Sequence, residues 1–129
     1  MYIQKDYFMR MITEMIRATA RLVFNRELKR DFSREEEEDV PAEMRKQYEK
    51  LLRMIEVGEI NEAENILTDG LRADDLNSFR MALMFYDRLN ELPEEFLAEH
   101  DFSKEEVLDG VRYVIRYFGC GDILSAFPE

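Results

Sequence analysis

Residues 48–71 decide the fold, because they join two amphipathic helix patterns through a glycine turn. The stretch reads Tyr48-Glu-Lys-Leu-Leu-Arg-Met-Ile-Glu-Val-Gly58-Glu-Ile-Asn-Glu-Ala63-Glu-Asn-Ile-Leu67-Thr-Asp-Gly70-Leu71. Apolar residues recur every three or four positions on each side of Gly58, as they do along one face of an α-helix. These residues are Met44, Tyr48, Leu51, Leu52 and Ile55 before the turn, and Ala63, Ile66, Leu67, Gly70 and Leu71 after it. Two helices joined this closely pack antiparallel, so we predict a helical hairpin.

Signals for helix ends support the hairpin. Pro41 suits the first turn of the first helix, where its missing N–H costs nothing. Gly58 can adopt the left-handed conformation that closes this helix. Asn61 is a candidate N-cap for the second helix, and Glu64 stands three residues later as its capping-box partner.

The turn and second helix of this hairpin resemble half of a tetratricopeptide (TPR) repeat. In that repeat a turn glycine is followed by a small, a large apolar and another small residue, as Gly58, Ala63, Leu67 and Gly70 are here. The small residues let two helices approach closely. Leu51 departs from the motif, which has a small residue there, and no second copy follows at a period of about 34 residues. The resemblance implies a TPR-like α-α arrangement without a long superhelix.

The whole chain resembles an uncharacterised family of small bacterial (Firmicutes) proteins of unknown function. The resemblance rests on Asp6-Tyr7-Phe8-Met9-Arg10-Met11-Ile12, on residues 58–67, and on Phe96-Leu97, Phe102-Ser103 and Glu105-Glu106. It implies a shared fold and supplies no activity.

Length and composition predict one all-α domain spanning residues 1–129. A hydrophobic content of 46% suits a globular protein, and five glycines and three prolines favour long helices over turn-rich β structure. The single cysteine excludes an internal disulfide. The N-terminus has no signal-peptide pattern, and no apolar run reaches the roughly 20 residues that span a bilayer. We therefore expect a cytoplasmic protein.

The charge is unevenly distributed. The net charge of −11 argues against nucleic-acid binding, which depends on neutralising phosphates. Residues 1–30 nevertheless hold seven Lys or Arg and only three Asp or Glu. This basic segment is expected to pack on its own acidic body or on a partner subunit, with an anionic membrane or nucleic acid as the lesser alternative. Residues 30–40 form an acidic linker whose block 35–39 lacks the glycine bend and alternating ligands of a calcium loop.

A long N-terminal helix is predicted from Ile3 to about Leu28. Its apolar side is formed by Phe8, Met11, Ile12, Met15, Ile16, Thr19, Leu22 and Val23, and its other side carries Arg10, Arg17 and Arg21. The helix would be roughly 35–40 Å long. We expect it either to pair two copies in a C2 homodimer or to lie along the hairpin within one chain.

About five helices are predicted in all. Asp74 or Asp75 caps a helix ending near Glu91, whose apolar centre at residues 81–86 needs covering on most sides and is expected to meet the N-terminal helix. Further signals are Pro93 for a short helix, Ser103 and Glu106 as a capping box, Gly119 as a helix end, and Ile123, Leu124 and Phe127 in a tail that can dock.

The sequence offers no pattern of catalytic or metal-binding residues. A nucleophile needs a base in reach, and nothing in the sequence brings His100 and Cys120, the only His and the only Cys, together. Two candidate ligands are too few for zinc, and phosphate-binding glycine loops are missing. We therefore expect no enzyme activity, no cofactor and no metal. The methionines either line an adaptable groove or fill core gaps, namely Met9, Met11, Met15, Met81 and Met84.

The expected function is a non-catalytic protein–protein interaction module that self-associates. Candidate interface residues are Phe8, Arg10, Met11, Met15, Arg17, Arg21, Met81 and Met84, and the structural hairpin residues are Gly58, Ala63, Leu67 and Gly70. Two alternatives stay open. In the first, the chain is an accessory subunit that docks on an anionic membrane or a larger complex through its basic helix. In the second, it is a helical bundle that binds a small ligand.

Overall fold

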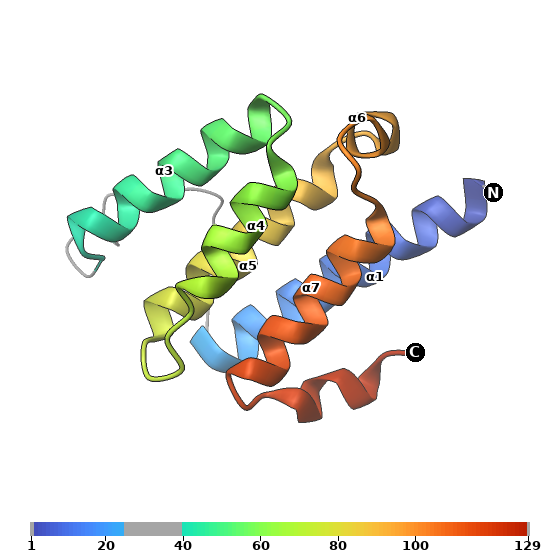
Figure 1. Ribbon diagram of the computed structural model, residues 1–129. Helices are drawn as coiled ribbons and strands as arrows, with labels where there is room; N and C mark the ends of the chain where they lie inside the picture. The colour runs from blue at the N-terminus through green and yellow to red at the C-terminus, as the bar shows by residue number, and fades with distance from the viewer. Residues whose placement is uncertain (1, 25–39, 129) are drawn as a thin grey trace.

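The computed structural model describes residues 2–24 and 40–128, and these residues form an all-helical fold (Figure 1). The elements are α1 (Tyr2–Thr19), the π-helical turn η1 (Ala20–Phe24), α3 (Ala42–Glu56), α4 (Ile60–Asp69), α5 (Leu76–Glu91), α6 (Glu94–Glu99), α7 (Lys104–Tyr117) and the 3₁₀ turn η2 (Gly121–Ala126). The predicted fold class is confirmed. The predicted linker over residues 30–40 lies outside the described residues except for Val40, which is buried.

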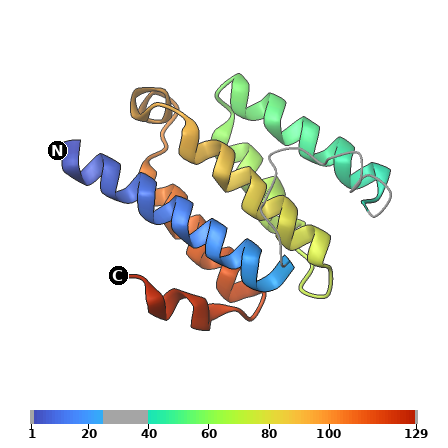
Figure 2. The ribbon, with the colours of Figure 1, turned by 180° about the vertical axis from the view of Figure 1, so that it is seen from behind.

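The helices lie in two layers. α4 and α7 lie side by side in front in Figure 1, and Figure 2 shows α5 and α1 in front when the molecule is seen from behind. Every residue from 78 to 86 is buried, as a helix that is apolar on all sides requires. α1 packs on both α5 and α7. The prediction that the N-terminal helix covers residues 81–86 is therefore confirmed.

α1 belongs to the core of its own chain. Its residues Met11, Ile12, Met15 and Ile16 are buried against the other helices. The predicted long helix from Ile3 to about Leu28 is helical as far as Phe24, because α1 ends at Thr19 and a π-helical turn follows, and its last four residues lie outside the described residues. The Thr19 hydroxyl donates to the Met15 carbonyl at 2.7 Å, a bond that often bends helices.

The predicted hairpin is formed by α3 and α4. Gly58 has the expected left-handed backbone, with φ +89°, and Ala63 and Leu67 are fully buried. Gly70 is exposed and ends α4, so it does not serve a close helix contact. The result is one packed helix pair in which Ala63 is fully buried.

The predicted capping box at the start of α4 is wrong. α4 begins at Ile60, and the Asn61 side chain donates instead to the His100 and Asp101 carbonyls at 3.4 and 3.1 Å. Glu64 accepts a hydrogen bond from the Tyr86 hydroxyl. Both side chains therefore join α4 to other parts of the fold, which a local pattern does not encode.

Replacing Ala63 with leucine is expected to destabilise the chain by about 2 kcal/mol, because overpacking a filled site displaces its neighbours. Ala63 has no exposed surface, whereas Ala98 on α6 is exposed. Urea unfolding of Ala63→Leu beside the control Ala98→Leu measures the effect. Equal midpoints for the two variants would show that the site of Ala63 has room for a larger side chain.

The other predicted helix signals are largely confirmed. The Asp75 carboxylate accepts from the Asn77 N–H at 2.9 Å, and the Ser103 hydroxyl oxygen accepts from the Glu106 N–H at 3.2 Å. Gly119 has φ +78° and follows α7. The tail docks through η2, since Ile123, Leu124 and Phe127 pack against the core.

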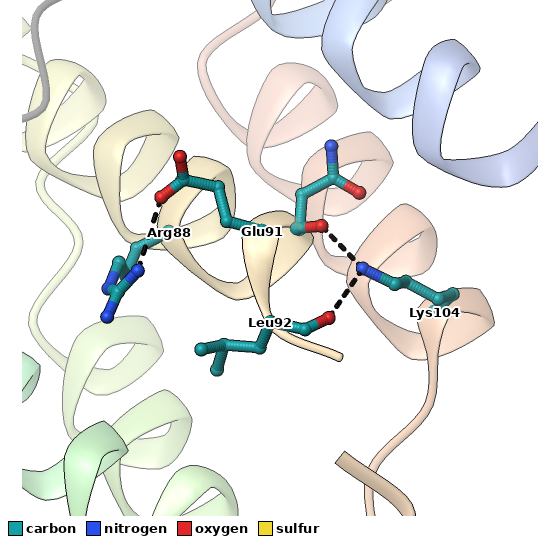
Figure 3. Close-up of polar contacts among 5 residues, drawn as sticks. Arg88, Glu91, Leu92 and Lys104 are labelled. Atoms are coloured by element: carbon teal, nitrogen blue, oxygen red, sulfur yellow. Dashed lines mark hydrogen bonds and ion pairs between the residues drawn. The ribbon is translucent and has the colours of Figure 1, made fainter. Parts of the chain in front are cut away.

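Lys104 joins the start of α7 to the end of α5 (Figure 3). Its side chain is buried, and its ammonium group donates to the backbone carbonyls of Asn90 and Leu92, the latter at 3.0 Å. The Asn90 amide in turn donates to the Met9 carbonyl at 3.1 Å and to the Thr13 hydroxyl at 3.0 Å. Three helices, α1, α5 and α7, are thus linked through the C-terminal turn of α5. Within the described ranges, none of the helices is both long enough and apolar enough to pass through a bilayer.

Candidate functional site

A groove of about 420 Å³ lies between α4 and α7, with α5 beneath it. Its lining comprises Glu64, Thr68, Tyr86, Glu106, Asp109, Gly110 and Tyr113. These residues come from three different helices, α4, α5 and α7. The groove therefore exists only in the folded chain.

The floor of the groove is a buried tyrosine that passes beneath α7. A Cβ atom at Gly110 would lie 2.2 Å from Cε1 of Tyr86, so only glycine leaves space for this ring. The Tyr86 hydroxyl emerges on the α4 side and donates to Glu64 at 2.7 Å. A glycine inside α7 thereby positions a carboxylate on α4.

The floor is electrostatically unusual. Burial raises the pKa of Glu64, the negative charge of Glu106 raises it further, and the hydrogen bond from Tyr86 opposes both effects. Burial also raises the pKa of Tyr86, as does the neighbouring Glu64. Tyr86 therefore stays protonated and donates its hydrogen bond at neutral pH.

Carboxylates are the charged groups that line the groove, and none of its lining residues is Lys or Arg. Arg112 approaches Asp109 at 3.8 Å from outside the lining, and the Asp109 side chain remains 74% exposed. Among the residues that the structure describes, no three His, Cys, Asp or Glu side chains are placed to hold a metal ion. Glu64, Glu106 and Asp109 therefore make the lining of the groove acidic.

An aromatic rim follows the groove along α7. Tyr113 is 51% exposed, and its ring centroid lies 6.1 Å from that of Tyr117, which is 39% exposed. The Tyr117 hydroxyl donates to the Leu71 carbonyl at 3.0 Å, so this ring is held in place. Tyr113 also lines the groove.

Stability should depend on pH through Glu64. Its pKa lies above the ordinary 4.5, so between 4.5 and the folded-state pKa the native chain binds more protons than the unfolded chain. Stability contributed by Glu64 is then fully present below 4.5 and is lost as the pH rises through this window. Glu64→Gln removes this titration. As the pH rises through this range, the stability of the variant minus that of wild type should therefore increase, and above the folded-state pKa of Glu64 the difference should become constant.

Urea unfolding at several pH values between about 4 and about 8 measures this difference. Glu62→Gln is the matched control, because Glu62 is an exposed carboxylate on the same helix. A difference between wild type and Glu64→Gln that does not vary with pH would contradict the raised pKa.

The candidate interface residues from the sequence divide into two groups. Met11, Met15, Met81 and Met84 are buried in the core, so they fill gaps between helices and do not line a surface groove. Phe8 is half-buried against the same core. The exposed members of the set are Arg10, Arg17 and Arg21 on α1 and η1.

The hairpin residues position the neighbouring loop. A Cβ atom at Gly58 would lie 2.1 Å from the His100 ring, so this turn packs directly on the end of α6. His100 Nδ1 is 2.8 Å from the Phe96 carbonyl and must carry the hydrogen, since a carbonyl can only accept. The Cys120 thiol lies 3.7 Å from the Phe118 carbonyl, beyond the end of α7. The His100 and Cys120 side chains therefore each contact a backbone carbonyl near the end of the preceding helix.

The groove was not predicted from the sequence. Glu64 and Glu106 were assigned to helix caps, Tyr86 was placed in the apolar centre of its helix, and Gly110 and Tyr113 were given no role. One signal was present: glycine costs about 1 kcal/mol relative to alanine inside a helix, and Gly110 lies in the middle of α7. Such a glycine often marks a close approach of neighbouring groups.

Comparisons with known proteins give a family but no characterised relative. Neither the curated proteins nor the solved structures contain a match to this chain. The model of one protein family matches residues 2–119, which run from the start of α1 to just beyond α7 and include the groove. The chain therefore belongs to DUF6483, a family of unknown function.

Proposed function

We propose that this chain is a non-catalytic protein–protein interaction module of the cytoplasm, built on a TPR-like α3–α4 hairpin, and that it associates with copies of itself, beginning with a dimer. The observation that carries the proposal is the open groove between α4 and α7 with its exposed tyrosine rim.

The rim has the composition of a recognition surface. Tyrosine is enriched in protein interfaces, because it offers a large apolar area together with a hydroxyl group. Tyr113 and Tyr117 lie next to each other on α7, and the groove beside them can receive side chains from another protein. Docking there would bury both rings without rearranging the core.

Light scattering of the full chain over a dilution series tests this function. We expect a mass above the 15.5 kDa of one chain that falls on dilution. Tyr113→Ala should weaken the association about tenfold or more, as truncating a central interface aromatic does. Val57→Ala is the control, because Val57 is 69% exposed at the α3–α4 turn. A single chain at every concentration would contradict self-association.

A small cationic ligand is the second candidate, favoured by the partly buried Glu64 in the groove. Spermidine or arginine amide should then raise the melting temperature of wild type but not of Glu64→Gln. Equal shifts for both proteins would contradict this candidate.

Docking on an anionic membrane is a weaker alternative. A helix that lies on a membrane inserts an apolar face, and the apolar face of α1 is already buried in its own core. The groups on this helix that could bind a membrane are then mainly the charged side chains of Arg10, Arg17 and Arg21. Sedimentation with anionic liposomes, compared between wild type and a variant with these arginines changed to glutamate, measures any such binding.

A further inference from the structure

The exposed side of α1 and η1 is a basic surface, formed by Arg10, Arg17 and Arg21 and here named the arginine face. All three residues are exposed. None forms an ion pair with a residue whose side chain the structure describes. Glu14 is the acidic residue among them, so the surface retains a net positive charge.

The groove has the opposite charge and suits a guanidinium group. Glu64 offers a carboxylate from the α4 wall, and Glu106 and Asp109 offer carboxylates from the α7 wall. A guanidinium is planar and can bond to carboxylates through several N–H donors. Tyr113 adds an aromatic ring, and the face of such a ring attracts a cation.

The two surfaces also match in length. Arg10 and Arg17 are two helical turns apart on α1, which is about 10.5 Å at the rise of an α-helix. Glu106 and Tyr113 are separated by the same seven residues on α7. One arginine can therefore meet the carboxylates while the other meets the aromatic rim.

We propose that the arginine face of one copy docks in the α4–α7 groove of a second copy. This inference rests on the proposed self-association and names the two surfaces that meet. Opposite charges on the two surfaces favour the encounter and its orientation. They also make the association sensitive to salt, because the charges involved are exposed.

The contact is head-to-tail. α4 and α7, whose residues form the walls of the groove, lie in front in Figure 1, whereas α1 lies in front in Figure 2, where the molecule is seen from behind. A docked pair therefore leaves one free arginine face and one free groove, and further copies can add. A symmetric pairing of α1 with α1 would instead bring arginines against arginines.

Two variants with neutral substitutions separate these geometries. The face variant carries Arg10→Gln, Arg17→Gln and Arg21→Gln, and the groove variant carries Glu106→Gln and Asp109→Asn. Each variant alone should associate at least about tenfold more weakly than wild type. An equimolar mixture should form a pair of about twice 15.5 kDa and nothing larger, because it contains one intact copy of each surface.

Light scattering over a dilution series at about 0.05 M and about 0.5 M salt gives the masses. Arg53→Gln with Glu56→Gln is the control, because both residues are exposed on α3 outside the two surfaces. Thermal melting of every variant checks that the fold is kept. Weaker association of wild type at high salt, together with a control variant that associates like wild type at each salt concentration, supports the proposal.

Three results would overturn it. A groove variant that associates like wild type, beside a face variant that does not, would mean that α1 pairs with α1, and self-association itself would stand. A mixture that remains two separate chains would exclude this contact. A wild type that stays a single chain would remove both self-association and the inference, and arginine-dependent binding to anionic liposomes would then assign the arginine face to a membrane.

Discussion

Replacing Gly110 with alanine is expected to lower the free energy of unfolding by about 3 kcal/mol, the upper part of the range for overpacking. The new Cβ would lie 2.2 Å from a ring carbon of Tyr86 and 2.7 Å from its hydroxyl oxygen. A buried aromatic ring is rigid, and the surrounding side chains leave it little room to move aside. The higher helix propensity of alanine, worth about 1 kcal/mol, offsets only part of this cost.

Two further comparisons test whether the Tyr86 ring causes this loss of stability. Gly121→Ala should be nearly neutral, because a Cβ there would meet its nearest neighbour at 3.7 Å. In a Tyr86→Leu background the cost of Gly110→Ala should shrink, since the ring that it strikes is gone. Urea or thermal unfolding is measured for wild type and for four variants, namely Gly110→Ala, Gly121→Ala, Tyr86→Leu and Tyr86→Leu with Gly110→Ala. A stabilising Gly110→Ala would show that Tyr86 does not pass beneath α7.

Replacing Lys104 with methionine is expected to cost about 3 kcal/mol of stability. The substitution keeps the length of the apolar side chain but removes the donor to the carbonyls of Asn90 and Leu92. A buried acceptor left without a partner costs about 1–3 kcal/mol, and two acceptors are affected. The damage should reach α1 as well, because the Asn90 side chain bonds to Met9 and Thr13.

The matched control is Lys50→Met, since Lys50 is exposed on α3. Urea unfolding gives the loss of stability, and hydrogen exchange shows whether the amides at the end of α5 lose protection first. If Lys104→Met and Lys50→Met unfold at the same urea concentration, the ammonium group does not hold the two helices together.

The local signals of the sequence predicted most of the helix ends. Gly58, Asp75, Ser103 and Gly119 act where they were expected, because a cap depends on backbone groups within one helical turn. The exception, at Asn61, is informative. Its side chain bonds to carbonyls about 40 positions away, and no local pattern reports that such partners will be nearby.

The methionines show a second limit of the sequence. Met11, Met15, Met81 and Met84 have the helical spacing of an apolar face, and that spacing fits a core and a surface groove equally well. The structure buries all four. Which reading holds depends on the neighbouring helix, and periodicity does not specify the neighbour.

The sequence by itself determined the all-α fold class, the hairpin around Gly58, the buried character of α5 and the basic character of α1. Each of these follows from composition, spacing or chemistry within a few residues. Only the tertiary structure decided that α1 packs in its own core and that Glu64, Tyr86 and Gly110 meet in one groove. Such sites depend on how three helices pack against each other, and that packing is fixed by side-chain contacts between segments far apart in the chain.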